Sequence, residues 1–261
     1  MRTAIIGHGA IASYVTTELR RLGTAPALVV ARPGRGQVAE AALGIPALTE
    51  IEDLPDDIGL VLDCAGHSAL AAFGPSLLTR GIDLITVSAG AFADAALADT
   101  LAGAATAGGA RIQVVAGSIG GLDALAAAGT GGLTRVSYRG RKPPAAWRGS
   151  PAADLLDLET LCEPADFFRG TARTAALEYP KNANVAAATA LAGVGFDLTE
   201  VVLTADPGIS RNRHEITADG VFGQFTFHIE GRPLPGAPGS SALAAMSMVQ
   251  AVVSRNSAIW T

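Results

Sequence analysis

Apolar and polar residues follow one pattern over the first 118 residues of this chain and a different pattern after them. In the first part, short apolar runs are separated by stretches that carry apolar residues at helical spacing. The apolar runs lie at 4–6, 27–30, 44–48, 60–64, 83–88 and 111–115, and the clearest helical stretches lie at 13–22 and 95–107. Strands that alternate with helices are typical of an α/β fold with a parallel, doubly wound sheet. We therefore predict one such domain over residues 1–118.

A second domain of another kind is predicted for residues 119–238. Alternating strand patterns and the dipeptide Asp219-Gly220, a strong signal for a tight hairpin turn, indicate an α+β domain on a mainly antiparallel sheet. The remaining residues, 239–261, are predicted to form a C-terminal helix that packs back toward the first domain. The strands expected in the second domain are Leu133–Arg141, Val201–Ala205, Arg211–Ala218 and Val221–Glu230, with a helix at Val185–Leu191.

The expected hairpin places one histidine on a covered face. If Asp219-Gly220 forms the turn, then Ile216 pairs with Gly223 and His214 pairs with Phe225. Residues two apart on a strand share a face, so His214 should lie on the apolar side with Ile216. A histidine there is either a core residue with satisfied hydrogen bonds or a site residue at the edge of a cleft, and position alone favours the core residue.

The first strand leads into a glycine-rich turn and a helix. Gly7 permits the tight turn, Gly9 lets a pyrophosphate approach the backbone, and Ala12 lets the helix pack closely on the strand. Free backbone N–H groups of the first helical turn, which contains Ala10 and Ile11, then favour bound phosphates. In this strand–turn–helix context the motif predicts a Rossmann domain that binds a dinucleotide. The alternative is a glycine-rich turn that serves packing alone.

The end of the second strand bears on which dinucleotide is bound. NAD-binding units usually carry an acidic residue there, which accepts hydrogen bonds from the ribose hydroxyls. This chain has Arg32 and Arg35 instead and no acid. Arg32 is therefore a candidate contact for the 2′-phosphate of NADP, although both arginines would also suit a solvated loop. We expect NADP, or the use of both cofactors.

Small residues follow the later strands at the edge where the cofactor would cross the sheet. Cys64 and Ala65 end the strand that begins near Leu60, and Ser88 ends the next. We predict that these three residues contact the cofactor. His67 is either a cofactor contact or a cap for the helix expected to start at Ser68, and we favour a structural role.

Composition and charge narrow the class of protein. A formal charge of −5 argues against a nucleic-acid-binding surface. Although 49% of residues are hydrophobic, no apolar run is long enough to span a membrane without glycine or charge, and no export leader is expected at the N-terminus. Cys64 and Cys162 are too few for a disulfide framework and lack zinc-ligand spacing, so we expect a reduced, cytoplasmic enzyme with no metal site.

Six sequence blocks together resemble the L-aspartate dehydrogenase family. In chain order they are GHGAIA, VLDCAGH, SAGAF, AGSIGGLDAL, EYPKNANVAAATALAG and TADPGISRNRHEI. The resemblance implies reversible oxidative deamination of L-aspartate by NAD or NADP, through iminosuccinate to oxaloacetate and ammonia. It also implies a Rossmann domain followed by an α/β domain that contributes to a homodimer, and a possible supply of iminosuccinate to NAD biosynthesis.

The resemblance carries functional roles onto individual residues. The family's catalytic histidine falls on His214, which reverses the preference for a core role. Its further cofactor contacts fall on Ser118, where alanine is more common, and on Asn184. With an unperturbed pKa near 6.5, His214 would suit acid–base work near neutral pH. Lys181 and Asn182, at a turn before a helix, are candidates for binding a substrate carboxylate.

Two other kinds of function remain open from the sequence. One is another two-domain NAD(P) oxidoreductase, similar to homoserine dehydrogenase or dihydrodipicolinate reductase, because a fold alone does not fix an activity. The other is a dinucleotide sensor without catalysis, which would need the glycine motif but no proton carrier. The block around Lys181 and the hairpin with His214 favour the aspartate enzyme.

Overall fold

The computed structural model describes residues 2–259, which divide into two compact units. One unit runs to Val115 and takes up the chain again from Ala244, and the other is Ala116–Leu243. The C-terminal helix thus belongs to the same unit as the N-terminal strands. Within the described residues, no helix combines the length and the apolar character needed to cross a membrane.

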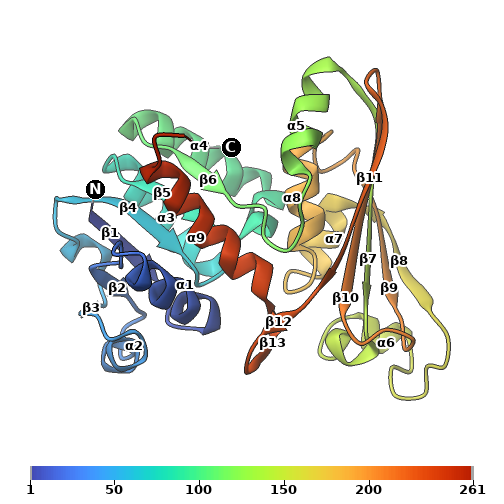
Figure 1. Cartoon of the computed structure of the whole chain (residues 1–261), viewed down its shortest axis with the longest axis horizontal. Coiled ribbons are helices and arrows are strands. Elements are labelled where there is room, and N and C mark those ends of the chain that lie inside the picture. The colour runs from blue at the N-terminus through green and yellow to red at the C-terminus, as the bar shows by residue number, and fades with distance from the viewer. Residues whose placement is uncertain (1, 260–261) are drawn as a thin grey trace. The chain divides into compact units, whose positions relative to one another are not determined.

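The first unit is a six-stranded parallel sheet with the strand order β3-β2-β1-β4-β5-β6 (Figure 1). This order, in which the chain starts in the middle and winds outward both ways, confirms the predicted doubly wound sheet. Its strands are β1 (Arg2–Ile6), β2 (Leu28–Val30), β3 (Ala47–Leu48), β4 (Ile58–Asp63), β5 (Asp83–Thr86) and β6 (Ile112–Val114). Its helices are α1 (Ala10–Arg21), α2 (Gly36–Leu43), η1 (Ile51–Asp53), α3 (His67–Thr79), η2 (Ala89–Ala93), α4 (Ala95–Gly108) and α9 (Ala242–Asn256).

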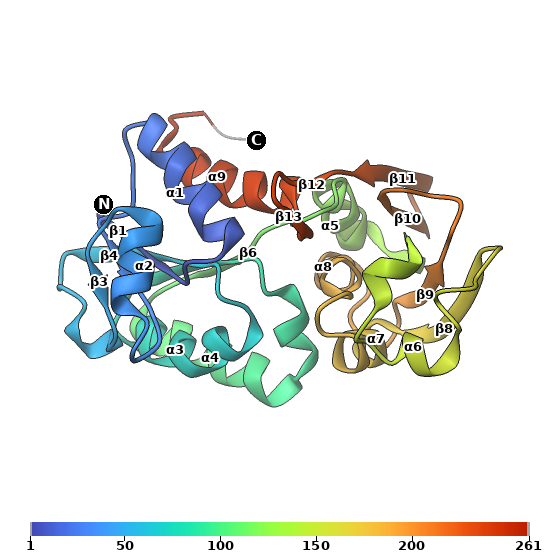
Figure 2. The ribbon, with the colours of Figure 1, turned by 90° about the horizontal axis from the view of Figure 1, so that it is seen from below.

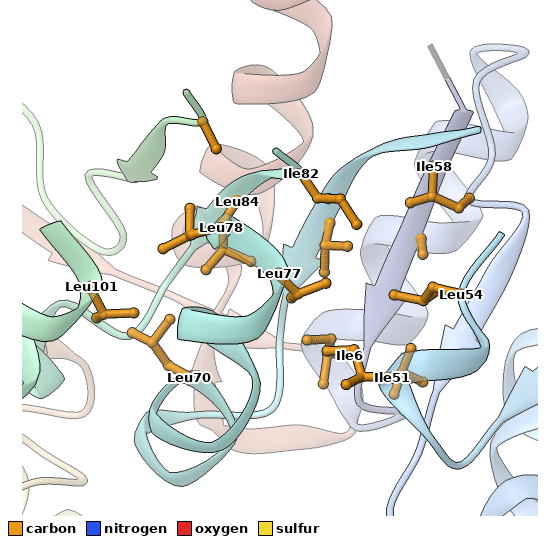
Figure 3. Close-up of a cluster of buried hydrophobic side chains, with 14 of the residues drawn as sticks. Ile6, Ile51, Leu54, Ile58, Leu70, Leu77, Leu78, Ile82, Leu84 and Leu101 are labelled. Carbon is orange, nitrogen blue, oxygen red and sulfur yellow. The ribbon is translucent and has the colours of Figure 1, made fainter. Parts of the chain in front are cut away.

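Apolar side chains fill both faces of this sheet. Along β1, Ala4 and Ile6 belong to one buried cluster and Ile5 to another, as expected for a strand covered on both sides. In the first cluster, leucines of α3 and α4 lie against the sheet (Figure 3). The second cluster includes Met248 and Val252, so α9 supplies part of the core that covers β1.

The second unit is a five-stranded sheet with the order β11-β10-β7-β9-β8. Only β7 and β9 pair in parallel within it, so the sheet is mainly antiparallel as predicted. Helices α5, α7 and α8 lie on one of its faces (Figures 1 and 2). The strands are β7 (Leu133–Lys142), β8 (Ala165–Thr171), β9 (Glu200–Ala205), β10 (Asn212–Gly220) and β11 (Gly223–Gly231), and a separate small ribbon pairs β12 (Pro233–Leu234) with β13 (Ala237–Ser241). The helices are α5 (Leu122–Gly131), η3 (Pro144–Trp147), α6 (Ala152–Leu155), α7 (Ala172–Glu178) and α8 (Asn184–Ala192).

The predicted turn of the hairpin is wrong by two residues, so each predicted cross-strand partner is wrong by four. Gly220 pairs with Gly223, so the turn is Val221-Phe222, and His214 lies opposite Ile229 rather than Phe225. Gly220 is needed for another reason: a Cβ there would lie 2.4 Å from the carbonyl oxygen of Gly132. The predicted face is nevertheless correct, because His214, Ile216 and Ala218 are all buried on one side of β10.

Two helix starts also differ from the prediction. Helix α8 begins at Asn184, one residue before the predicted start at Val185, and its N-cap is Ala183. Helix α3 begins at His67 itself after Gly66, so His67 is not the capping residue. The sequence pattern gave no prediction for β8 or α7, which complete the second unit.

Candidate functional site

Two glycines shape the turn between β1 and α1, one by allowing a close contact and the other by leaving the backbone open. Gly7 has φ +94°, and a Cβ there would lie 3.0 Å from Cβ of Ala65 in the turn after β4. The two turns at this sheet edge can therefore meet only if residue 7 lacks a side chain. A Cβ on Gly9 would meet nothing within 4 Å, so the backbone there is open to an incoming group.

A cavity of about 490 Å³ lies at this edge, within the first unit. It brings together five residues of the predicted cofactor site, namely Gly7, Gly9, Arg32, Cys64 and Ala65. Ala12 is fully buried beneath the turn, while Ala10 and Ile11 form the start of α1. Arg32 is exposed at the cavity, and Arg35 does not line it. Burial and the neighbouring Asp63 raise the pKa of the Cys64 thiol, which therefore stays protonated.

Ser88 is not at the cavity, because a buried carboxylate holds it. Asp63 has no exposed surface and accepts hydrogen bonds from Thr86 Oγ1 (2.6 Å), Ser88 Oγ (2.9 Å) and the backbone N–H of Ala65 (3.0 Å). Burial raises the pKa of Asp63, and these hydrogen bonds oppose the rise. Asp63 thus ties the end of β5 to the turn that contacts Gly7.

The second unit contains its own cavity, of about 570 Å³, whose lining combines cationic and neutral polar side chains with proline, alanine and glycine residues. Four of its residues carry positive side chains and a fifth is His214, yet none of its lining residues is acidic. Such a site favours an anion with more than one negative group. The side chains that give the cavity its character are Lys142, Lys181, Asn182, Ser210, Arg211, Asn212, His214, Arg232, Ser240 and Ser241.

Lys142 is the most buried of these cations, with 7% of its surface exposed. Its Nζ donates to the side-chain and main-chain oxygens of Asn182 (2.9 and 3.2 Å) and lies 4.9 Å from the ring centroid of Trp147. Trp147 is itself fully buried and donates Nε1–H to the carbonyl of Thr204. Burial lowers the pKa of Lys142 to about 8. A carboxylate that entered the cavity would stabilise its charged form.

His214 projects from the covered face of β10 and is 3% exposed. Its Nδ1 lies 2.8 Å from Tyr138 Oη on the neighbouring strand β7. Burial lowers the pKa of His214 from 6.5 to about 3, and the positive Lys142 and then His228 act in the same direction. The expectation of an unperturbed pKa is therefore wrong for the unliganded protein, in which His214 is a neutral imidazole.

An ion pair secures the loop that leads into β10. Arg141 Nη2 and Nε both donate to Asp206 Oδ2, and Asp206 is 1% exposed. The other carboxylate oxygen accepts the backbone N–H of Gly208 (2.9 Å). Arg213, on the opposite face of β10 from His214, donates to Glu230 instead (2.9 Å).

The structure thus brings together the three residues of the predicted substrate site, and it leaves two of the predicted cofactor contacts apart from both cavities. Lys181, Asn182 and His214 line one cavity, as the sequence suggested, whereas Ser118 and Asn184 line neither cavity described above. Ser118 is half-buried in the turn after β6, and Asn184 is the first residue of α8.

Three residues were missed in the sequence, although each of them left a signal there. Lys142 and Tyr138 fall on the covered face of one alternating strand, and Asp63 is an acid that ends an apolar run. Only the fold could show that Lys142 meets Asn182 and that Tyr138 meets His214.

Family models match both units. A model described as the C-terminal domain of aspartate dehydrogenase matches residues 123–255, which is about half of the chain. A model described as the NAD-binding domain of homoserine dehydrogenase matches residues 7–115. The first unit is therefore a nicotinamide-dinucleotide-binding domain.

Full-length relatives agree with both matches. The L-aspartate dehydrogenase of Ruegeria pomeroyi is 52% identical over 99% of this chain and 94% of its own length, and that of Cupriavidus taiwanensis is 43% identical over 99% of each. The crystal structure of aspartate dehydrogenase from Thermotoga maritima superposes with a TM-score of 0.79, with 26% identity over 100% of this chain and 99% of that one. An archaeal homoserine dehydrogenase bound to NADPH shares the fold (TM-score 0.60, 11% identity). The chain belongs to the L-aspartate dehydrogenase family.

Proposed function

We propose that this chain catalyses the reversible oxidative deamination of L-aspartate with a nicotinamide dinucleotide. The observation that carries the proposal is the cavity of the second unit, where four cations and one histidine meet with no acidic residue among the lining groups. Aspartate and oxaloacetate each bring two carboxylates, which match this charge. An amino acid with one carboxylate would leave part of the positive charge of the cavity unpaired.

Lys142 is the strongest candidate to hold one carboxylate. Asn182 fixes its ammonium group by two hydrogen bonds, and the Trp147 ring covers it, so the charge is already oriented and partly removed from water. Lys181 is exposed at the cavity, so its ammonium group attracts a carboxylate but is less firmly fixed in position than that of Lys142. Arg232 is a further cation available for the second carboxylate, and Arg211, which also donates to Glu230 (3.3 Å), is another.

His214 is the group placed to handle protons and hydrogen bonds at the reacting carbon. It lines the same cavity as Lys142, and it is neutral before substrate binds because burial and nearby positive charge disfavour the imidazolium. A bound dicarboxylate would weaken the effect of Lys142 and raise the pKa of His214. From a pKa of about 3, His214 nevertheless meets the substrate as a neutral imidazole.

The first unit has the features needed to hold the dinucleotide. Gly7 brings two turns together, Gly9 leaves the backbone open, and Ala10 and Ile11 offer N–H groups at the start of α1. When bound, the nicotinamide would exchange a hydride with Cα of the substrate. Cys64 and Ala65 also line this cavity. Ser88 stays in the proposal because of its place at a strand end, and Ser118 and Asn184 stay as residues assigned by resemblance.

The position of Arg32 supports a preference for NADP. It is exposed at the cavity beyond β2, where no acidic residue is available to accept hydrogen bonds from ribose hydroxyls. Its guanidinium would pair with a 2′-phosphate. A homodimer, which the resemblance implies, stays a prediction for sedimentation measurements.

Reductive amination tests the proposal directly. The loss of reduced-nicotinamide absorbance is followed with oxaloacetate and excess ammonium, separately with NADH and NADPH. Oxidation that requires both oxaloacetate and ammonium supports the proposal, and the ratio of the two cofactor rates reports on Arg32. Oxidation without ammonium would indicate a keto-acid reductase. Cofactor binding without turnover on any amino acid would indicate a dinucleotide sensor.

A further inference from the structure

The contact between Tyr138 and His214 depends on a glycine between them. Tyr138 and Gly140 lie two residues apart on β7, and Gly140 pairs directly with His214 across the two strands. A Cβ on residue 140 would lie 2.6 Å from Tyr138 Oη and 3.1 Å from its Cζ. The tyrosine ring therefore occupies the space that any other side chain at residue 140 would fill. Only in that position does its hydroxyl reach Nδ1 of His214 (2.8 Å).

The hydrogen-bonding needs of this pair fix the direction of the bond. Tyr138 is 1% exposed, and its hydroxyl has no hydrogen-bond partner other than His214 among residues 2–259. A buried hydroxyl that fails to donate loses a hydrogen bond without compensation. Tyr138 satisfies its donor only if Nδ1 of His214 accepts. A neutral imidazole that accepts at Nδ1 carries its proton on Nε2.

Nε2 is the ring nitrogen that remains for the cavity. Across residues 2–259, the buried side-chain nitrogens and oxygens without a partner are Thr16 Oγ1 and Ser241 Oγ, so Nε2 of His214 is not sealed in the protein. His214 lines the second-unit cavity, whereas Tyr138 does not. The hydroxyl thus acts from behind the imidazole, on the side away from the substrate.

We propose that Tyr138 is a positioning residue that holds His214 in the Nε2–H tautomer, so that His214 meets the substrate as a hydrogen-bond donor. Gly140 is the residue that makes this arrangement possible. The inference deepens the proposed function and rests on it for the identity of the substrate. It assigns to Tyr138 and Gly140 a role in the reaction that the glycine motif and the charged cavity do not require.

Charge on the neighbouring groups supports this arrangement. Burial raises the pKa of the Tyr138 hydroxyl well above its ordinary value, so the hydroxyl keeps its proton. The pKa of His214 is lowered to about 3, with Lys142 and His228 as the charged or titratable neighbours that contribute. Both partners are therefore neutral near pH 7.

The Nε2–H tautomer suits the step in which ammonia adds to oxaloacetate. The ammonia nitrogen forms a bond to the carbonyl carbon, and the π electrons of the carbonyl move to its oxygen, which becomes negatively charged. A donor held beside that oxygen stabilises the charge as it develops. Neutral histidine serves as such an electrophile in triosephosphate isomerase. In the reverse direction the same donor stabilises the same intermediate.

The tautomer is measured directly by ¹⁵N NMR on full-length protein labelled at histidine, with His214 assigned from the spectrum of His214→Gln. We expect a pyridine-type Nδ1 and a protonated, pyrrole-type Nε2 in the wild-type protein near neutral pH. In Tyr138→Phe, the resonances should move toward a mixture of tautomers. A protonated Nδ1 with a bare Nε2 in the wild type would overturn the proposal, and so would a spectrum unaffected by Tyr138→Phe.

Kinetics test the catalytic half of the proposal. We expect Tyr138→Phe to lower kcat for reductive amination about tenfold with little change in KM, since one hydrogen bond is lost behind the imidazole. Gly140→Ala should act similarly because it displaces the tyrosine. Gly131→Ala is the matched control, since a Cβ there meets nothing within 4 Å.

The double variant separates positioning from general damage. If both changes remove the same hydrogen bond, Tyr138→Phe with Gly140→Ala should be no slower than the slower single variant. Losses in kcat that multiply, or a wild-type kcat in Tyr138→Phe, would contradict the role in catalysis. Because the NMR readout needs no substrate, failure of the proposed aspartate activity is distinguishable from failure of the tautomer assignment.

Discussion

The two cavities of this molecule are lined by different kinds of residues. The cavity of the first unit is formed by turns of small residues, and its shape depends on a backbone contact between Gly7 and Ala65. The cavity of the second unit depends on polar side chains, of which Lys142 and His214 are held by hydrogen bonds to Asn182 and Tyr138. The first cavity recognises its ligand through the shape of the backbone, and the second cavity recognises its ligand through the charge of its side chains.

This difference separates the kinds of change that each cavity should tolerate. In the first unit, truncating a side chain should do little, whereas adding a single methyl group at the turn should do much. In the second unit, truncation should remove the chemistry while the backbone stays as it is. The predictions below test this contrast, beginning with the largest effect.

His214→Ala should lower kcat by about two to four decades, the usual contribution of one positioned proton-handling group. Dinucleotide affinity should stay the same, because His214 belongs to the cavity of the second unit. Steady-state kinetics and fluorescence titration with NADPH measure the two quantities. Turnover near the wild-type rate would remove His214 from the proposed role.

Lys142→Met should weaken the binding of succinate, an unreactive dicarboxylate, about 100-fold. Loss of one partner from a buried charge pair costs about 3 kcal/mol, and each tenfold change in affinity corresponds to about 1.4 kcal/mol. Lys181→Met is the matched control, because that lysine is exposed and should contribute less than about tenfold. Equal effects of the two changes would contradict the ranking of the two cations.

The same lysine predicts how inhibition depends on pH. Burial disfavours the charged ammonium, so Lys142 loses its proton at about pH 8 in the free enzyme. The inhibition constant of succinate should be level below that pH and rise up to about tenfold per pH unit above it. In Lys142→Arg the rise should disappear, since arginine stays charged. A level profile in the wild type up to pH 10 would contradict the assignment.

The glycine turn offers a paired test in the first unit. Gly7→Ala should cost about 1–3 kcal/mol of folding free energy, because φ is +94° and the new Cβ would lie 3.0 Å from Ala65. Gly9→Ala should leave stability unchanged, since its Cβ meets only open space, yet weaken dinucleotide binding about tenfold. Thermal unfolding and fluorescence titration separate the two. If Gly9→Ala binds as the wild type does, the pyrophosphate lies elsewhere.

Arg32→Ala is expected to have the smallest effect. It should raise the KM for NADPH about fivefold and leave that for NADH unchanged, because an exposed guanidinium gains little from pairing with a phosphate. Arg35→Ala serves as the control, since Arg35 does not line the cavity. Equal changes for both cofactors would mean that Arg32 does not contact the 2′-phosphate.

The contrast between the cavities also explains what could be predicted from the sequence. The first cavity comes from one turn motif and the ends of neighbouring strands, and local pattern predicts both. The second is assembled from segments near residues 142, 181, 211 and 240, whose proximity depends on the whole sheet. The sequence therefore gives no prediction for Lys142, predicts Lys181 from its place at a turn before a helix, and assigns a catalytic role to His214 through family resemblance.

The hairpin shows where a strong local signal misleads. Asp219-Gly220 is a favourable turn dipeptide, but Gly220 is required where the backbone of Gly132 approaches it, and the turn forms at Val221-Phe222. The prediction of which face of β10 is buried is still correct. A shift of the pairing within the hairpin changes which residues lie opposite each other, but it does not change which residues of β10 point to the covered side.

The central claim is that the second-unit cavity selects a substrate with two carboxylates. Reductive amination of oxaloacetate and of pyruvate, which lacks the second carboxylate, tests this most directly when both are measured with saturating ammonium and NADPH. We predict that kcat/KM for oxaloacetate exceeds that for pyruvate by at least about 100-fold, the worth of one well-placed carboxylate contact. Comparable values for the two keto acids would contradict the account.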